Sequence, residues 1–186
     1  MHSTPTDRRR GEATRAAIRA AGARLFAEHG FQDTSVRDIA REAGVDPALV
    51  IRHFRSKERL FIETMSVEDP ARSIVEGPLE QLGEAMVAGT LARSDRAKKV
   101  YTALMRAADH EEVRDAIARA NHATVIAPLA RRLSGHDAQL RAALVSAQLN
   151  GLLNTLWMIE DEAVTRVPTE VLITEYGRAL QVLIDG

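Results

Sequence analysis

The sequence predicts an all-α fold in which a three-helix N-terminal domain of the helix-turn-helix type precedes a larger helical domain. Along most of the 186-residue chain, apolar residues recur at helical spacing, and the strict alternation typical of strands is absent. Alanine, leucine, arginine and glutamate dominate the composition, and all four favour helices. Glycine, proline and capping residues divide the chain into about nine helices.

Four of these helices are expected in the first third of the chain. Gly30 suits the end of the first helix, because glycine accepts the left-handed conformation that often follows a helix. Ser35 can cap the second helix, and Asp46 can cap the third. Pro47 then takes the first helical position, where its missing N–H does no harm. With Ser56 as the cap of the fourth, the predicted ranges are 12–29, 35–42, 46–54 and 56–65.

Five further helices are expected beyond a hinge. Asp69-Pro70 and Gly77-Pro78 punctuate this hinge, and Pro128 should kink or break the helix that contains it. We place one domain at residues 10–66 and the second at residues 67–186. The helices predicted in the second domain cover residues 78–92, 95–108, 110–133, 137–163 and 168–184.

The charge distribution differs between the two predicted domains. The whole chain has a formal net charge of −1, but residues 1–65 carry a net +3 and residues 66–186 a net −4. A basic N-terminal part favours an anionic partner for that part alone. The absence of cysteine excludes disulfides and zinc–thiolate sites. No apolar run approaches the roughly 18–20 residues of a membrane span, and residues 1–10 lack the apolar stretch of a secretory signal, so we predict a cytoplasmic protein without a membrane segment.

The segment AGVDPALVIRHF, residues 43–54, predicts a third helix of only about two turns. An isolated helix of that length is marginal in water, so it needs support from its neighbours. The tight turn at Gly44 predicts a helix-turn-helix unit over about 35–54, whose third helix lies in the DNA major groove. Val50 and Phe54 should face the core. The residues expected to point outward are Pro47, Ala48, Ile51 and Arg52.

The stretch FAEHGFQDTSVRDIAREAGVDPALVIRHFRSKERLF, residues 26–61, resembles the tetracycline-repressor (TetR) family of bacterial transcriptional regulators. The matching positions are Phe26, Gly30-Phe31, Thr34, Ile39-Ala40, Ala43-Gly44-Val45, His53-Phe54, Ser56-Lys57-Glu58 and Leu60. The resemblance covers roughly residues 12–65 and implies a DNA-binding domain there. By length and helical pattern, residues 67–186 look like the family's ligand-binding and dimerisation domain.

The resemblance assigns DNA-contact roles by position. Thr34 and Ser35 look like phosphate contacts, because N–H groups at the start of a helix also favour anions. His53 and Lys57 match positions that commonly grip phosphates. Ile51 departs from the family, which usually has tyrosine there, and offers an apolar contact, such as one to a thymine methyl, in place of a hydroxyl. The full set of implied DNA contacts is Thr34, Ser35, Arg37, Pro47, Ala48, Ile51, Arg52, His53 and Lys57.

The second domain carries large or adaptable side chains and a few amides that suit an apolar or amphipathic ligand. Asn150 and Asn154 lie one helical turn apart, with Gly151 beside them. A glycine inside a helix costs up to about 1 kcal/mol relative to alanine, so another helix or a ligand should approach closely there. The candidate ligand contacts are Met86, Tyr101, Leu104, Met105, His122, Asn150, Asn154, Trp157 and Met158. A core or surface position is the alternative for each of them.

The resemblance implies a ligand-responsive repressor that binds a pseudo-palindromic, double-stranded DNA operator as a homodimer. The resemblance places the dimer interface on the helices at 137–163 and 168–184, which carry apolar stripes. A small-molecule effector would release the operator by favouring a state whose recognition helices no longer match the operator spacing. The alternatives are a DNA-binding regulator without an effector and a helical small-molecule-binding protein.

The sequence predicts neither an enzyme nor a metal or cofactor site. His110-Glu111-Glu112 invites comparison with the zinc helix motif, but Arg114 stands where that motif needs its second histidine. His122 and His136 are too scattered along the chain to support a site with His110. Neither a nucleophile elbow nor a glycine-rich phosphate loop occurs in the sequence.

Overall fold

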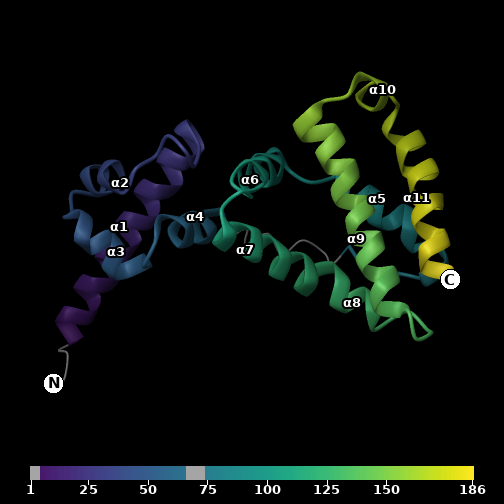
Figure 1. Cartoon of the computed structure of the whole chain (residues 1–186), viewed down its shortest axis with the longest axis horizontal. Coiled ribbons are helices and arrows are strands. Elements are labelled where there is room, and N and C mark those ends of the chain that lie inside the picture. Colours follow the sequence, from purple (N-terminus) through teal and green to yellow (C-terminus); the bar gives the residue numbers. More distant parts are fainter. Residues whose placement is uncertain (1–4, 66–73) are drawn as a thin grey trace. The chain divides into compact units, whose positions relative to one another are not determined.

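Helices account for all the regular structure in the part of the chain that the computed structural model describes, residues 5–65 and 74–186 (Figure 1). These described residues contain no strand, so the predicted all-α fold is confirmed. The chain divides into two compact units. The first comprises Met1–Val67 and Lys99–Ala116, and the second comprises Glu68–Lys98 and Ile117–Gly186.

The first unit contains the predicted N-terminal helices and a segment from later in the chain. Its helices are α1 (Pro5–His29), α2 (Val36–Ala43), α3 (Pro47–Phe54), α4 (Lys57–Met65), most of α6 (Asp95–Arg106) and the first part of α7 (Glu111–Asn121). The ends of α2, α3 and α4 lie within one residue of the prediction, whereas α1 begins at Pro5 instead of residue 12. Residues 99–116 join this unit through contacts between segments far apart in the sequence, which no local pattern predicts.

Three phenylalanine rings form the centre of the first unit. The centroid of the Phe61 ring lies 5.1 Å from that of Phe26 and 4.9 Å from that of Phe31. All three side chains are buried, and aromatic pairs at such distances add about 0.5–1.5 kcal/mol to the stabilisation from burial. Nη2 of Arg15 on α1 also donates to both carboxylate oxygens of Glu63 on α4, at 2.9 and 2.7 Å. These contacts hold α1 against α4.

The second unit has a separate core. Its elements are η1 (Leu79–Gln81), α5 (Leu82–Leu91), the π-helical turn η2 (His122–Ile126), α8 (Ala127–Ala130), α9 (Ala138–Asn154), the π-helical turn η3 (Thr155–Ile159), α10 (Glu162–Thr165) and α11 (Thr169–Asp185). Buried side chains of α5, α8, α9 and α11 form one cluster. Helix α11 packs against both α5 and α9 (Figure 1).

Two predicted helices of the second domain differ from the structure. The helix predicted over 110–133 passes through η2 before Pro128, because proline supplies no N–H to the turn that precedes it. The helix predicted over 137–163 ends at Ile159, since Glu160 adopts the left-handed conformation with a φ of 55°.

Helix α10 follows this break as a separate short helix. The described residues therefore contain ten helices, when α7 and α8 are counted as one, instead of about nine. The predicted hinge residues Asp69-Pro70 and the boundary after residue 66 lie outside the described residues, so that boundary stays a prediction.

Two glycines bring α5 and α11 into backbone contact. A Cβ atom on Gly83 would lie 2.2 Å from the carbonyl oxygen of Gly177, and one on Gly177 would lie 2.7 Å from Cα of Glu84. Because no side chain fits at such distances, only glycine allows the two helices to approach so closely. The side chain of Gln181 completes the contact by accepting from the Gly83 N–H and donating to the Leu79 oxygen, both at 2.9 Å.

Arg141 of α9 is a buried arginine that joins the ends of two helices. Its guanidinium donates to the backbone oxygens of Leu183 and Ile184, at 3.3 and 3.1 Å, near the end of α11. The same group bonds the backbone oxygen of Ser134 and the carboxylate of Asp137, which precede α9. It supplies donors to carbonyls that the last turn of a helix leaves unpaired, and so fixes α11 on α9.

Among the described residues, one segment, Ala138–Ile159, is long and apolar enough by length and composition to cross a membrane, contrary to the expectation that the chain has none. The segment comprises α9 and η3, and one side of it packs in the core of the second unit. It also contains the buried Arg141, whose guanidinium is fully engaged inside the unit. We therefore interpret the segment as a core helix.

We expect Gly83→Ala to lower the free energy of unfolding by about 3 kcal/mol, because the added methyl group overlaps backbone atoms of α11. Urea denaturation followed by circular dichroism measures the change. Gly11→Ala on α1 is the matched control, since nothing lies within 4 Å of its added methyl group. The control should leave stability unchanged or raise it by up to about 1 kcal/mol. Parent-like stability of Gly83→Ala would contradict the close contact.

Candidate nucleic-acid interface

Helices α2 and α3 are capped by the residues that the sequence predicts as their N-caps, Ser35 and Asp46. The Ser35 hydroxyl accepts from the Asp38 N–H at 3.1 Å, and the Asp38 carboxylate accepts from the Ser35 N–H at 3.2 Å, which forms a capping box. Hydrogen bonds from the hydroxyl and the N–H of Ser35, followed by one from Arg41, lower the pKa of Asp38 below its usual value. At the start of α3, the Asp46 carboxylate accepts from the Ala48 N–H at 2.7 Å.

The turn between α2 and α3 depends on Gly44. Its φ of 65° lies in the left-handed region that glycine adopts without a steric penalty. The N–H of Val45 then donates to the Ala40 oxygen at 2.9 Å and that of Gly44 to the Arg41 oxygen at 3.3 Å, which closes the end of α2. Only three residues separate the two helices, as in a helix-turn-helix unit.

Helix α3 has one buried and one exposed face. Val50 and Phe54 are buried among the supporting helices, as the sequence predicts. Ile51 on the other face is 45% exposed, although it is a large apolar residue. The exposed side chains of this outer face are Pro47, Ala48, Ile51 and Arg52. A short helix is therefore held by its inner face, and its outer face is left free for a partner.

Arg37 and Arg52 are exposed and form no ion pair with the described residues. Arg41 differs from them because its guanidinium is paired with the Asp38 carboxylate. An unpaired guanidinium can offer its five N–H donors to phosphate oxygens or to a guanine edge. The positive charges of these two unpaired guanidinium groups thus lie at the start of α2 and on the outer face of α3.

Thr34 and Lys57 form hydrogen bonds inside the unit. The buried Thr34 hydroxyl donates to the Gly30 oxygen at 2.8 Å. The Lys57 ammonium donates to the oxygens of Phe31 and Thr34, at 2.9 and 3.1 Å, and lies 4.0 Å from the centroid of the Phe31 ring. The Thr34 hydroxyl is thus a structural group here, whereas Lys57 retains one of its three N–H donors for a phosphate.

The end of α3 contains a side-chain nitrogen without a hydrogen-bond partner and a residue with a strained backbone conformation. Nε2 of the half-buried His53 has no hydrogen-bond partner among the described residues. Arg55 ends the helix with a φ of 70°, which costs a non-glycine residue about 1–3 kcal/mol. Unpartnered polar atoms and strained residues concentrate at functional sites, so both agree with a binding role for this end of α3.

The predicted ligand contacts divide between the two units. Three of them, Tyr101, Leu104 and Met105, are half-buried on α6 in the first unit, and burial raises the pKa of Tyr101. Met86 is fully buried in the core of the second unit, and His122 is exposed. Those on α9 and η3 are Asn150, Trp157 and Met158, which are half-buried, and Asn154, which is exposed. Met86 is therefore a core residue, and the ligand role of the others stays a prediction.

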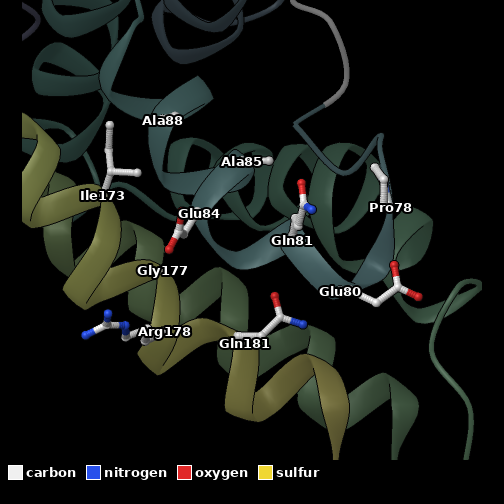
Figure 2. Close-up of a pocket in the computed structure, with 10 residues that line it drawn as sticks. All are labelled: Pro78, Glu80, Gln81, Glu84, Ala85, Ala88, Ile173, Gly177, Arg178 and Gln181. Carbon is white, nitrogen blue, oxygen red and sulfur yellow. The ribbon is translucent and has the colours of Figure 1, made fainter.

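A groove that the sequence does not indicate lies between α5 and α11 (Figure 2). Its volume of about 680 Å³ falls in the range of ligand pockets. Glu80 and Glu84 line it from one side, and Ile173 and Arg178 from the other. Its residues come from segments far apart in the sequence, so only the packing of α5 on α11 brings them together.

Family profiles match both parts of the chain. The profile described as bacterial regulatory proteins of the tetR family matches residues 18–64, and the tetracyclin repressor-like C-terminal domain matches residues 80–184. An HTH-type transcriptional repressor of Mycobacterium tuberculosis is 48% identical over 59 residues, which are 30% of this chain and 31% of that protein. The regulator BetI of Agrobacterium fabrum is 43% identical over 51 residues, 27% of this chain and 25% of BetI. The matched stretch spans about a third or less of these relatives' length.

Solved structures resemble nearly the whole chain. A TetR-family regulator from Streptomyces coelicolor A3 matches with a TM-score of 0.63 and 29% identity, over 100% of both chains. NalD of Pseudomonas aeruginosa, described as the secondary repressor of the MexAB-OprM multidrug efflux pump, matches with a TM-score of 0.60 and 25% identity, over 93% of this chain and 95% of NalD. These matches agree with the resemblance seen in the sequence.

We expect Ser35→Ala to destabilise the first unit by about 1 kcal/mol, because the Asp38 N–H loses its acceptor at the start of α2. Urea denaturation measures the loss. Ser35→Thr keeps the hydroxyl and should retain most of the stability. If Ser35→Ala were as stable as the parent protein, the capping box would not be needed to begin α2.

Proposed function

This chain belongs to the tetracycline-repressor family of bacterial regulatory proteins, and on that basis we propose that it is a dimeric repressor that a small molecule releases from its DNA operator. The C-terminal profile covers more than half of the chain. Members of the family are transcriptional regulators and not enzymes, as the sequence predicts. The observation that carries the proposal is the exposed outer face of α3, which follows the capped helix α2 after a three-residue turn. A cytoplasmic location is part of the same proposal.

Two kinds of DNA contact are proposed for the first unit. The start of α2 and the exposed Arg37 suit phosphates, because N–H groups and the helix dipole there favour anions. Arg52 and Ile51 on the outer face of α3 suit base edges in the major groove, Arg52 through hydrogen bonds to guanine and Ile51 through a thymine methyl. Ile51 replaces the family's usual tyrosine, so we expect this chain to prefer an operator sequence different from those of members that carry the tyrosine.

A second copy of the chain supplies the second recognition helix. The proposed interface begins on α9, where Leu140, Leu144, Ala147 and Gly151 are all exposed and follow one another at helical spacing. Nothing lies within 4 Å of a Cβ atom built on Gly151. Glycine and alanine beside leucines allow the backbone of another helix to approach closely. We therefore propose that α9 of the second copy, and not a ligand, is the reason for a glycine at this position.

Other apolar residues of the predicted interface helices divide between the core and the surface. Leu152 and Leu180 are 3% and 0% exposed, so they belong to the core of their own unit. Val171 and Val182 of α11 are 47% and 72% exposed and are available for an interface. The proposed dimer contact thus uses the outer sides of α9 and α11, which their own unit leaves uncovered.

Release by an apolar or amphipathic effector is the remaining part of the proposal. Helices α6 and α7 both begin in one unit and end in the other, with the changes after residues 98 and 116. Half-buried ligand candidates lie on α6 at residues 101, 104 and 105. A ligand that binds one arrangement of these helices more tightly than another shifts the population toward the first arrangement. Equal ligand affinity for free and DNA-bound protein would exclude this mechanism.

We expect Arg52→Ala to weaken operator binding by about ten- to a hundredfold, because the outer face of α3 loses its base-edge donor. The operator is first identified by sequencing genomic fragments that the purified protein retains, and the Kd is then measured by fluorescence anisotropy at several salt concentrations.

Arg119→Ala is the control for this measurement. Arg119 is exposed on α7, and its replacement removes the same charge as that of Arg52. It should change the Kd by less than about twofold. Equal losses in both variants would show that only net charge matters, and an unchanged Kd in Arg52→Ala would contradict the proposed reading of DNA by α3.

We expect Leu144→Glu to dissociate the dimer at micromolar concentration, because it buries a carboxylate in an apolar contact. Light scattering after size-exclusion chromatography measures the mass, and circular dichroism checks the helical fold. Gln139→Glu, also exposed on α9 but off the stripe, should remain dimeric. A dimer in both variants would show that the interface does not use this side of α9.

A further inference from the structure

Arg55, the residue that follows α3, has a backbone conformation that suits glycine. Its φ is 70° and its ψ is −45°, a region that residues with a side chain seldom occupy. The other positive φ values among the described residues of the first unit belong to Gly30 and Gly44, which end α1 and α2. Two of these three helix ends thus use glycine, and the arginine at the third needs a reason of its own.

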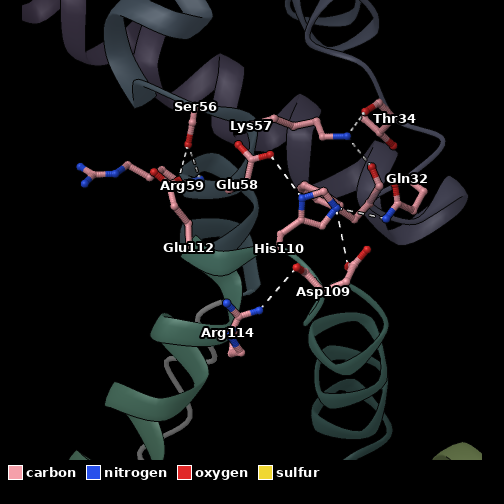
Figure 3. Close-up of polar contacts among 11 residues, drawn as sticks. Gln32, Thr34, Ser56, Lys57, Glu58, Arg59, Asp109, His110, Glu112 and Arg114 are labelled. Carbon is pink, nitrogen blue, oxygen red and sulfur yellow. Dashed lines mark hydrogen bonds and ion pairs between the residues drawn. The ribbon is translucent and has the colours of Figure 1, made fainter.

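The residues on both sides of Arg55 hold it in this conformation (Figure 3). Phe54 before it is buried in the first unit. The hydroxyl of Ser56 after it donates to the carboxylate of Glu112 at 2.7 Å. The ammonium of Lys57 bonds two backbone oxygens of the turn that follows α1. Since its neighbours are fixed by these contacts, Arg55 cannot relax to a negative φ without breaking some of them.

The side chain of Arg55 makes no contact that offsets this strain. It is exposed and forms neither a hydrogen bond nor an ion pair with the residues that the structure describes. The carboxylate of Glu58, three residues further along, lies 3.9 Å from the ring of His110 instead. The guanidinium of Arg55 therefore keeps all of its N–H donors for a group outside the described chain.

Arg55 also lies beside the outer face of α3. Its backbone N–H donates to the oxygen of Ile51 at 2.7 Å, which places Arg55 one helical turn beyond Ile51. The first residues of a recognition helix meet base edges in the major groove, and its far end leads toward the sugar–phosphate backbone. A guanidinium at that end can bind a phosphate through two parallel hydrogen bonds.

We propose that Arg55 binds a phosphate of the operator, and that this contact is the reason for an arginine at a position whose backbone favours glycine. The inference rests on the proposed function, because α3 must lie on DNA. It adds a residue that the family resemblance does not include among the DNA contacts. Phosphate contacts carry no sequence information directly, so Arg55 should strengthen binding to the operator and to an unrelated duplex alike.

Thermal unfolding of the full chain without DNA, followed by circular dichroism at one protein concentration, tests the strain. Arg55→Gly should raise the Tm by about 2–5 °C, because glycine adopts this φ without a steric penalty. Arg59→Gly is the matched control, since Arg59 is exposed inside the regular helix α4. It should lower the Tm by about 2–3 °C. A Tm that Arg55→Gly leaves unchanged or lowers would overturn the inference, because the position would carry no strain.

Fluorescence anisotropy tests the phosphate contact, with the operator and an unrelated duplex of equal length at several salt concentrations. Arg55→Ala should raise the Kd for both duplexes by about five- to tenfold and reduce the slope of log K against log salt concentration by about one. Arg55→Lys retains the charge and should keep the slope of the parent protein. Arg119→Ala should behave like the parent, because Arg119 is exposed on α7.

The outcomes separate this inference from the proposed function. A parent-like Kd and slope in Arg55→Ala would overturn the phosphate contact and leave the proposed function intact. A loss of affinity confined to the operator would also overturn it, because such a loss indicates a base contact. If the parent protein shows no salt-sensitive binding to either duplex, the proposed function fails and the inference fails with it.

Discussion

The first unit depends on the contacts that the buried ring of Phe31 makes with its neighbours. Its neighbours are Phe26 of α1, Phe61 and Lys57 of α4, and His110, which directly precedes α7. One buried side chain thus joins segments that lie far apart in the sequence. Edge-to-face and cation–π contacts have preferred directions, so they set the orientation of these segments as well as their burial. The turn that carries the ring leads directly into α2, which begins after the Ser35 cap.

Support from neighbouring helices explains why α3 can be so short. Eight residues do not form a stable helix in water, but α3 begins at the Asp46 cap and buries Val50 and Phe54. Its stability comes from the inner face, so the outer face can carry side chains chosen for a partner. The cost that remains at its end, in His53 and Arg55, agrees with a surface whose contacts are completed by another molecule.

The glycines of the second unit show how one residue type serves different purposes. Gly83 and Gly177 are buried and let the backbones of α5 and α11 touch. Gly151 is exposed and has no neighbour of its own chain at its missing side chain. The sequence shows only that a glycine inside α9 is costly and needs a reason. The direction in which that glycine faces excludes a contact inside the unit and agrees with the proposed contact with a second copy.

Local chemistry determined the helix ends and the helix-turn-helix unit from the sequence alone. The Ser35 and Asp46 caps and the left-handed Gly44 depend on neighbours within a few residues, so their patterns predict them. Tertiary structure decided that the Thr34 hydroxyl and most of the Lys57 ammonium bond inside the unit, that residues 99–116 belong with the N-terminal helices, and that a groove lies between α5 and α11. Each of these depends on contacts between residues far apart in the chain, whose distances no local pattern contains.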